Sequence, residues 1–280
     1  MIPTGLPPAV HADLSRVIES LGMLTPRWNA RILITLAGRP LRYTEIKSRM
    51  PWLQDGQLHP KLRWLSDAGL VERTEHGVRH VTYGLSARGR DLMPVLAVIS
   101  VWGDAHLEKA TPTAAGAQTA STVQDIEDSL VLISYRHATP ILWSLQARGA
   151  AGATAIAADA MPGQRLSAVY PRLRQLVDDR LVDTDAERTD YRLSSPGRAL
   201  APVYRALSAW AAGRPLADAA THPVWGHPPA PSQSATGMWA STAKTPPAPQ
   251  TTPAAQWRAG DLFSHQAPAR AGAPAGGHRR

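Results

Sequence analysis

In the first 110 residues, apolar residues recur at helical spacing, and a short segment over residues 70–85 instead has the pattern of β-strands. In chain order, the pattern predicts helices over residues 10–22, 45–49, 58–68 and 87–109, with strands over residues 41–43, 70–74 and 79–85. Glu75-His76-Gly77 lies between the last two strands and is typical of a hairpin turn.

Residue types at the expected helix ends agree with this assignment. Thr44 is a candidate N-cap for the helix over residues 45–49, and Met50-Pro51 ends that helix. Gly69 is a suitable stop after residue 68. Pro60 lacks an N–H, so we expect the regular helix to begin near His59, with Pro60 in its first turn. The order of elements is that of a winged helix-turn-helix domain, mainly α with a small β-hairpin wing.

The same pattern then recurs about 110 residues later. The matched segments are residues 27–36 with 136–145, 58–65 with 169–176, and 83–90 with 191–198. The offset varies by only a few residues, which indicates duplication of a whole domain rather than a solenoid repeat. We therefore expect an α+β chain of two tandem winged helix-turn-helix domains that pair as an intramolecular pseudo-dimer.

Composition places the domain boundaries. We expect domain 1 over residues 1–110, an Ala/Thr/Gly/Pro-rich linker over 111–122, domain 2 over 123–213 and a disordered tail over 214–280. The second domain is more degenerate, because residues 149–160 are Ala/Gly-rich and its hairpin is shorter. The tail carries Trp225, Trp239 and Trp257, which leaves open either low-complexity drift or short motifs that dock on a partner or on these domains.

Charge and composition narrow the function. The formal net charge is +8, and both domains are basic, with 13 Lys and Arg against 8 Asp and Glu in residues 25–110. Such a balance is compatible with ordinary solubility or with attraction to DNA. The chain has no cysteine, so disulfides and thiol chemistry are excluded. We find no signal sequence or membrane span and expect a cytoplasmic, nucleoid-associated protein.

No pattern in the sequence indicates an enzyme or a cofactor. The histidines lack metal-ligand spacing, and neither a nucleophile elbow nor a phosphate-binding glycine loop occurs. Six tryptophans of the two domains either pack in the cores or line an effector pocket, and core packing is favoured because four of them fall on apolar stripes. We therefore expect no catalytic residues, no metal and no cofactor.

The helix over residues 58–68 has the features of a DNA recognition helix. Its apolar stripe leaves an opposite face with donors and cations, the groups that read base edges and phosphates in the major groove. Thr44 is included as a phosphate contact at a helix N-terminus. The candidate DNA-binding residues are Thr44, Gln57, His59, Lys61, Arg63, Arg79 and His80 in the first domain, and Arg165, Tyr170, Arg172, Arg174 and Arg188 in the second. A solvated helix face is the alternative for any one of them.

The motifs also carry a family resemblance. Trp28…Ile32-Leu33, Tyr43-Thr44-Glu45-Ile46, Leu62-Arg63-Trp64-Leu65 and Tyr83-Gly84-Leu85-Ser86…Gly89-Arg90 occur in the order found in HxlR-type bacterial transcriptional regulators, which this chain resembles. The Pro in the recognition helix is also similar to PadR-type regulators. The resemblance implies double-stranded DNA as a partner and pairing through the terminal helices.

Two classes of function follow from these observations. The leading one is a transcriptional regulator that reads two unequal half-sites, as a monomeric pseudo-dimer or a homodimer. The rival is a winged-helix scaffold that binds a protein partner, partly through its tail, with little or no DNA binding. In a mixed version, only the first domain binds DNA and the second serves as its pairing partner.

Overall fold

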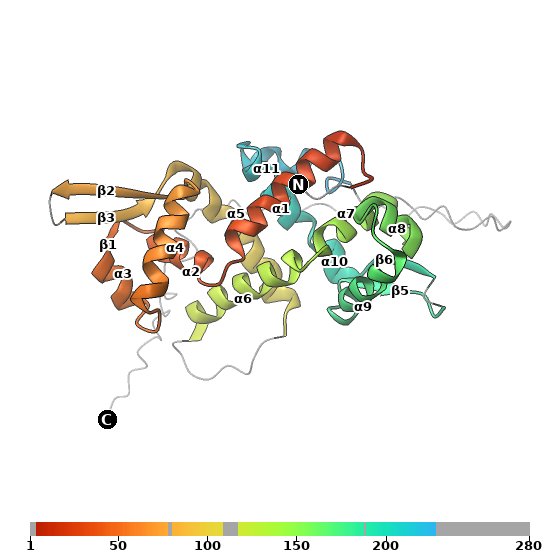
Figure 1. Ribbon diagram of the computed structural model, residues 1–280, viewed down its shortest axis with the longest axis horizontal. Helices are drawn as coiled ribbons and strands as arrows, with labels where there is room; N and C mark the ends of the chain where they lie inside the picture. The colour runs from red at the N-terminus through yellow and green to blue at the C-terminus, as the bar shows by residue number, and fades with distance from the viewer. Residues whose placement is uncertain (1–3, 78–79, 109–116, 188, 228–280) are drawn as a thin grey trace, which may run out of the picture.

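The structure is a computed structural model, and it describes residues 4–77, 80–108, 117–187 and 189–227 (Figure 1). The elements of the first unit are α1 (Pro8–Leu24), α2 (Asn29–Leu36), β1 (Leu41–Arg42), α3 (Tyr43–Arg49), α4 (Asp55–Asp67), β2 (Val71–Gly77), β3 (His80–Leu85) and α5 (Ala87–His106). This order confirms the mainly α, winged helix-turn-helix fold predicted from the sequence.

The second half has a parallel order of elements. They are α6 (Ala117–Ser134), α7 (Ala138–Arg148), β4 (Ala150–Gly152), α8 (Ala153–Ala160), the 3-10 turn η1 (Leu166–Ala168), α9 (Tyr170–Asp178), β5 (Val182–Thr184), β6 (Asp190–Leu193), α10 (Ser195–Ala199), α11 (Ala201–Ala211) and the 3-10 turn η2 (Leu216–Thr221). Each half contains a three-stranded antiparallel sheet, ordered β1-β3-β2 and β4-β6-β5. The Ala/Gly-rich segment 149–160 therefore holds a strand and a helix.

The motif that recurs at residues 83–90 and 191–198 joins each hairpin to its closing helix. Ser86 caps α5 by accepting a hydrogen bond from the N–H of Gly89 (3.0 Å), and it donates to the carbonyl of Gly69 (2.6 Å). A Cβ on Gly89 would lie 2.1 Å from the Leu70 carbonyl oxygen, so only glycine fits. The second half has the same contacts at Ser194 and Gly197. The repeated sequence therefore encodes one repeated junction.

Helices α1, α5, α6 and α11 bring the two units together. α1 packs against α11 and α7, while α6 packs against α5 and α2, so each unit's first helix lies on the other unit. The indole N–H of Trp102 donates to the carbonyl of Pro196 (3.2 Å), and that of Trp210 donates to the carbonyl of Arg88 (3.0 Å). These four residues occupy equivalent places in the two copies, so the contact is reciprocal, as in a two-fold dimer.

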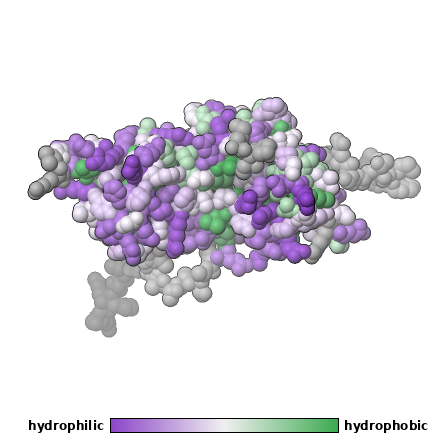
Figure 2. Space-filling model, in the orientation of Figure 1, coloured by the Kyte–Doolittle hydropathy of each residue, from purple (hydrophilic) through white to green (hydrophobic). Residues whose placement is uncertain are grey.

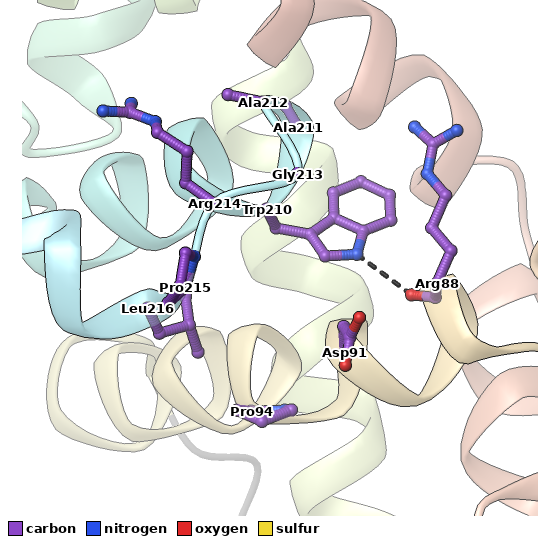
Figure 3. A pocket seen from close by; sticks show the side chains of 10 residues that line it. All are labelled: Arg88, Asp91, Pro94, Trp210, Ala211, Ala212, Gly213, Arg214, Pro215 and Leu216. Atoms are coloured by element: carbon purple, nitrogen blue, oxygen red, sulfur yellow. Dashed lines mark hydrogen bonds between the residues drawn. The ribbon is translucent and has the colours of Figure 1, made fainter.

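The surroundings of the two tryptophans differ despite this symmetry. Beside Trp210 lies an open pocket of about 880 Å³ whose lining includes Arg88, Asp91 and Arg214 (Figure 3). The pocket of about 470 Å³ beside Trp102 is lined mainly by apolar side chains, among them Val98 and Val203. In the view of Figure 2, polar side chains cover both ends of the molecule and apolar ones gather near its middle.

The structure corrects two of the predicted boundaries. Helix α6 begins at Ala117, inside the segment expected to be a linker over residues 111–122. Residues 214–227, expected to belong to a disordered tail, fold back on the second unit, and Trp225 is only 1% exposed. Trp239 and Trp257 lie outside the described residues. In the described part of the chain, no helix is long and apolar enough to cross a membrane.

The contact between α5 and α6 gives a test of the pairing. A Cβ on Gly103 would lie 2.6 Å from Ser129 Oγ and 2.9 Å from the Asp125 carbonyl oxygen. We expect Gly103→Ala to lower the free energy of unfolding by about 1–3 kcal/mol, because the two helices must separate. Gly22→Ala in α1 is the control: no atom lies within 4 Å of its Cβ, so stability should hold or rise by up to about 1 kcal/mol. Equal urea midpoints for the two variants would contradict this packing.

A buried carboxylate in the second unit predicts a pH dependence. Asp159 on α8 accepts hydrogen bonds from Arg148 Nε (2.6 Å) and Ser144 Oγ (2.7 Å) of α7. Burial alone would raise the pKa of the Asp159 carboxyl, but these hydrogen bonds hold it below its usual range. The carboxylate therefore contributes stability above about pH 4, and this contribution is lost as the pH falls through the lowered pKa.

We expect Asp159→Asn to be less stable than the unaltered chain at pH 7, with a difference that shrinks toward pH 3. Urea unfolding at pH 7, 5 and 3 measures it. A difference that stays constant over this range would show that the charge of Asp159 contributes nothing.

Candidate nucleic-acid interface

Helix α4 buries one face against its own unit and exposes the other. Leu58, Leu62 and Leu65 are at most 1% exposed, whereas Gln57, His59 and Arg63 are exposed. The predicted buried stripe is thus confirmed. These donors and this cation lie on the solvent side of α4, and α4 lies next to the β2–β3 hairpin at one end of the molecule (Figure 1).

The start of α4 differs from the prediction. The helix begins at Asp55, so Pro60 lies inside it and not in its first turn. The amides of Gln57 and Leu58 bond to the carbonyl of Gln54 and form a turn ahead of the proline. Pro60 removes one hydrogen bond of the helix, but it is exposed, so water can reach the carbonyl that the proline leaves without a partner.

The equivalent helix of the second unit is shorter. α9 begins at Tyr170, has Pro171 in its first turn and follows the 3-10 turn η1. It has 9 residues, against 13 in α4. Tyr170 is 48% exposed, and Arg165 and Arg174 are also exposed. The prediction of a helix start near the proline therefore fits the second unit but not the first.

Lys61 and Arg172 occupy equivalent positions, and both turn back toward their own unit. Lys61 is half-buried, with Nζ 3.5 Å from Asn29 Oδ1, and burial lowers the pKa of its ammonium group. The guanidinium of Arg172 lies over the ring of Tyr135, 5.4 Å from its centroid, and donates to its hydroxyl (3.3 Å). Lys61 thus connects α4 to the start of α2, and Arg172 connects α9 to the turn before α7. Their contact with phosphates stays a prediction.

Thr44 is exposed but is not an N-cap. Helix α3 begins one residue earlier, at Tyr43, with Arg42 as the capping residue. The carboxylate of Glu45 accepts the backbone N–H of Arg42 (2.7 Å) and a hydrogen bond from Arg39 (2.7 Å). These bonds, that of Arg42 first, lower the pKa of Glu45. An acidic side chain therefore already lies where Thr44 was expected to meet a phosphate.

The first hairpin carries a small polar cluster close to its turn. His80 Nε2 accepts a hydrogen bond from Arg42 Nε (3.2 Å), and its ring lies 4.9 Å from that of His76. Burial, followed by the charges of Arg42 and His76, lowers the pKa of His80. At neutral pH, His80 therefore acts as a neutral hydrogen-bonding group. Arg79, the other predicted contact of this hairpin, lies outside the described residues.

The second hairpin differs from the first in charge and length. β2 and β3 have 7 and 6 residues, whereas β5 and β6 have 3 and 4. Residues 182–193 contain four carboxylates and two arginines, while residues 71–85 contain two of each together with two histidines. Asp185 accepts hydrogen bonds from Thr189 within the loop. Arg188 lies outside the described residues. The described charges of this hairpin repel a polyanion.

A cluster missed in the sequence lies at the start of α2. The guanidinium of Arg27 lies 4.3 Å from the ring centroid of Trp28, and that of Arg31 lies 5.9 Å from the ring centroid of Trp52. Arg31 also pairs with Glu127 of α6 (3.2 Å). Trp52 is 53% exposed. The position of Trp52 directly after Met50-Pro51, in a predicted turn, could have indicated its exposure from the sequence. Its distance from Arg31 depends on the tertiary fold and could not.

Comparison with known proteins agrees with this geometry. The HxlR-like helix-turn-helix family matches residues 23–111. The uncharacterized HTH-type transcriptional regulator YdzF of Bacillus subtilis is 36% identical over 90 residues, which cover 31% of this chain and 83% of that protein. The chain belongs to the HxlR-like helix-turn-helix family. The family match ends before α6, so it covers the first unit only.

Further relatives have similar names. The HTH-type transcriptional regulator YodB of B. subtilis is 30% identical over 93 residues, or 32% of this chain and 82% of that protein. An uncharacterized HTH-type regulator of Methanothermobacter thermautotrophicus is 32% identical over 79 residues, covering 28% of this chain and 60% of that protein. No solved structure matches the chain. Among the described residues, no group of three or more His, Asp or Glu side chains is placed to hold a metal ion.

Proposed function

We propose that the protein is a transcriptional regulator that binds double-stranded DNA through both α4 and α9, on an operator with two unequal half-sites. The observation that carries the proposal is the exposed face of α4, where Gln57, His59 and Arg63 lie beside a hairpin in a unit of the HxlR-like family. Arg and Gln are the residue types that pair in bidentate fashion with guanine and adenine edges.

The pairing of the two units supports a two-site mode of binding. Reciprocal contacts at Trp102 and Trp210 fix the units relative to each other, and α4 and α9 lie toward opposite ends of the molecule (Figure 1). In helix-turn-helix dimers, paired recognition helices contact half-sites about one helical turn of DNA apart. One chain then supplies both recognition helices.

Differences between the units support an unequal operator. His59 is matched by Tyr170, and Gln57 by Ala168. The acidic second hairpin removes a phosphate contact that the first hairpin retains. The second unit therefore contributes less affinity, and the first determines most of the specificity.

A protein-interaction scaffold is the second candidate. Two observations favour it: the acidic second hairpin and the exposure of Trp52 (53%) and Trp64 (40%) on the first unit. If this candidate is right, specific DNA binding is absent. The mixed version, with DNA on the first unit only, predicts that α9 substitutions have no effect.

Removing the two outward arginines tests the role of the helices. We expect Arg63→Ala to weaken specific binding by about tenfold or more, since a bidentate base contact contributes about 1–3 kcal/mol. The double variant with Arg174→Ala should bind more weakly still. Each phosphate contact contributes about −0.9 to the slope of log K against log salt, so affinity should fall steeply with salt. Fluorescence anisotropy with labelled operator DNA measures both effects.

Arg205→Ala is the matched control, because it removes the same charge from α11, outside both recognition helices. If Arg63→Ala and the control weaken binding equally, net charge accounts for the binding and the helices do not read DNA. If the double variant binds as well as Arg63→Ala, the mixed version holds.

The operator itself provides an independent test. Selection of bound sequences from random DNA should enrich two half-sites that differ in sequence. The base preference should be stronger in the half-site read by α4. A perfectly palindromic consensus would contradict unequal reading by the two helices.

A further inference from the structure

The segment that follows α11 forms a compact turn with its own sequence requirements. His222 Nδ1 accepts hydrogen bonds from the backbone N–H groups of Val224 (3.0 Å) and Trp225 (2.9 Å). The carbonyl of His222 accepts the N–H of Gly226 (2.7 Å). A Cβ on Gly226 would lie 2.4 Å from that carbonyl oxygen, so no larger residue fits. The shape of the turn therefore depends on a histidine, and on a glycine four residues later.

Side chains of α7, α11 and α1 contact this turn. Trp225 stacks on Tyr204 of α11 (4.6 Å between ring centroids) and meets the edge of Trp143 of α7 (5.7 Å). Gln146 Nε2 donates to the carbonyls of Val224 (3.3 Å) and His227 (2.9 Å). A buried aromatic anchor combined with hydrogen bonds to the peptide backbone is how proteins recognise short peptide segments.

The third contact reaches the first unit. His222 Nε2 lies 2.7 Å from Asp13 Oδ2 on α1, and Nε2 is the donor because Nδ1 already accepts two N–H groups. The same carboxylate accepts a hydrogen bond from Ser208 Oγ of α11 (2.8 Å). Asp13 and His222 are 6% and 3% exposed. One carboxylate thus joins the N-terminal helix, the second unit and the C-terminal turn.

The receiving site is specific to the second unit. Trp143, Gln146 and Tyr204 are matched in the first unit by Ile34, Ala37 and Leu96, so the aromatic and amide groups do not belong to the shared fold. The indole Nε1 atoms of Trp143 and Trp225 are buried without a hydrogen-bond partner among the described residues. A buried donor without a partner costs free energy, so it reduces the net gain from binding the turn.

The segment between α11 and the turn allows residues 222–227 to dissociate from the site while α11 stays in place. Residues 212–215 are exposed, and Gly213 has a positive φ of 65°. η2 exposes most of its residues as well. Displacement of residues 222–227 therefore breaks the contacts described above without unwinding α11.

We propose that α1, α7 and α11 form a peptide-binding site for a His-x-x-Trp-Gly turn, filled within the chain by residues 222–227. When residues 222–227 fill this site, the bond from His222 to Asp13 holds α1 against the second unit. The motif therefore controls how stable the pairing of the two units is. A peptide with the same spacing, from a partner protein or another copy of this chain, is the class of ligand that competes for it. The site does not depend on DNA binding.

Hydrogen exchange of the full chain tests the proposal. We expect Trp225→Ala to raise exchange of the α1 amides at least tenfold, while α4 and the first hairpin keep theirs. Trp239→Ala, which removes a tryptophan from the same Pro-rich segment, is the matched control and should change nothing. Gly226→Ala distorts the turn without removing the anchor, so it should give the same pattern if Trp225→Ala fails to fold.

A synthetic peptide with the sequence of residues 219–230 provides the second measurement. It should bind the Trp225→Ala chain and restore α1 protection, and the same peptide with Ala in place of Trp should not. The unaltered chain should bind it at least tenfold more weakly, because the tethered motif occupies the site at high effective concentration. Uniformly faster exchange through α7, α8 and α9 without rescue by the peptide would overturn the proposal and make Trp225 an ordinary core residue.

Discussion

Two reciprocal indole hydrogen bonds lie in the helical interface between the halves of this chain, and each indole N–H donates to the backbone of the other half. Trp102 bonds to the carbonyl of Pro196 and Trp210 to that of Arg88. Trp102 and Trp210 are buried near the C-terminal ends of α5 and α11, and the acceptor carbonyls lie in the first turns of α10 and α5. The arrangement brings α5 and α11 together and lets α1 and α6 cross to the opposite unit. The placement of both candidate recognition helices depends on it.

Core leucines and the junction serines recur in both units, whereas several outward residues differ. Substitution at Leu62, Leu173 or the capping serines would disturb a core or a junction that both units share. Substitution at Gln57 or His59 changes only an exposed surface. Two units in one chain are also free to differ, because a change in one is not copied in the other. The charged pocket beside Trp210 and the apolar pocket beside Trp102 have diverged in the same way.

Local patterns predicted most helices of the first unit, its hairpin and the buried stripe of α4, because periodicity and capping residues act over a few positions. They missed α2 and placed the hairpin turn at residues 75–77, which belong to β2. Contacts over longer distances in the sequence were not predictable in this way. Trp225 lies in a Pro-rich segment that suggests disorder, and its ring partners are 21 and 82 residues away in the sequence. The start of α4 was placed too late, because the rule against proline inside a helix is weaker at an exposed position. The inward turn of Lys61 depends on Asn29, which no helical pattern relates to it.

In the proposed function, one chain carries both halves of a DNA-reading pair. The mass of the complex with its selected operator, measured by sedimentation or native mass spectrometry, shows how many chains bind. We predict one chain per operator, with protection of two unequal half-sites. Two chains bound to a single palindromic operator would contradict this mode of binding.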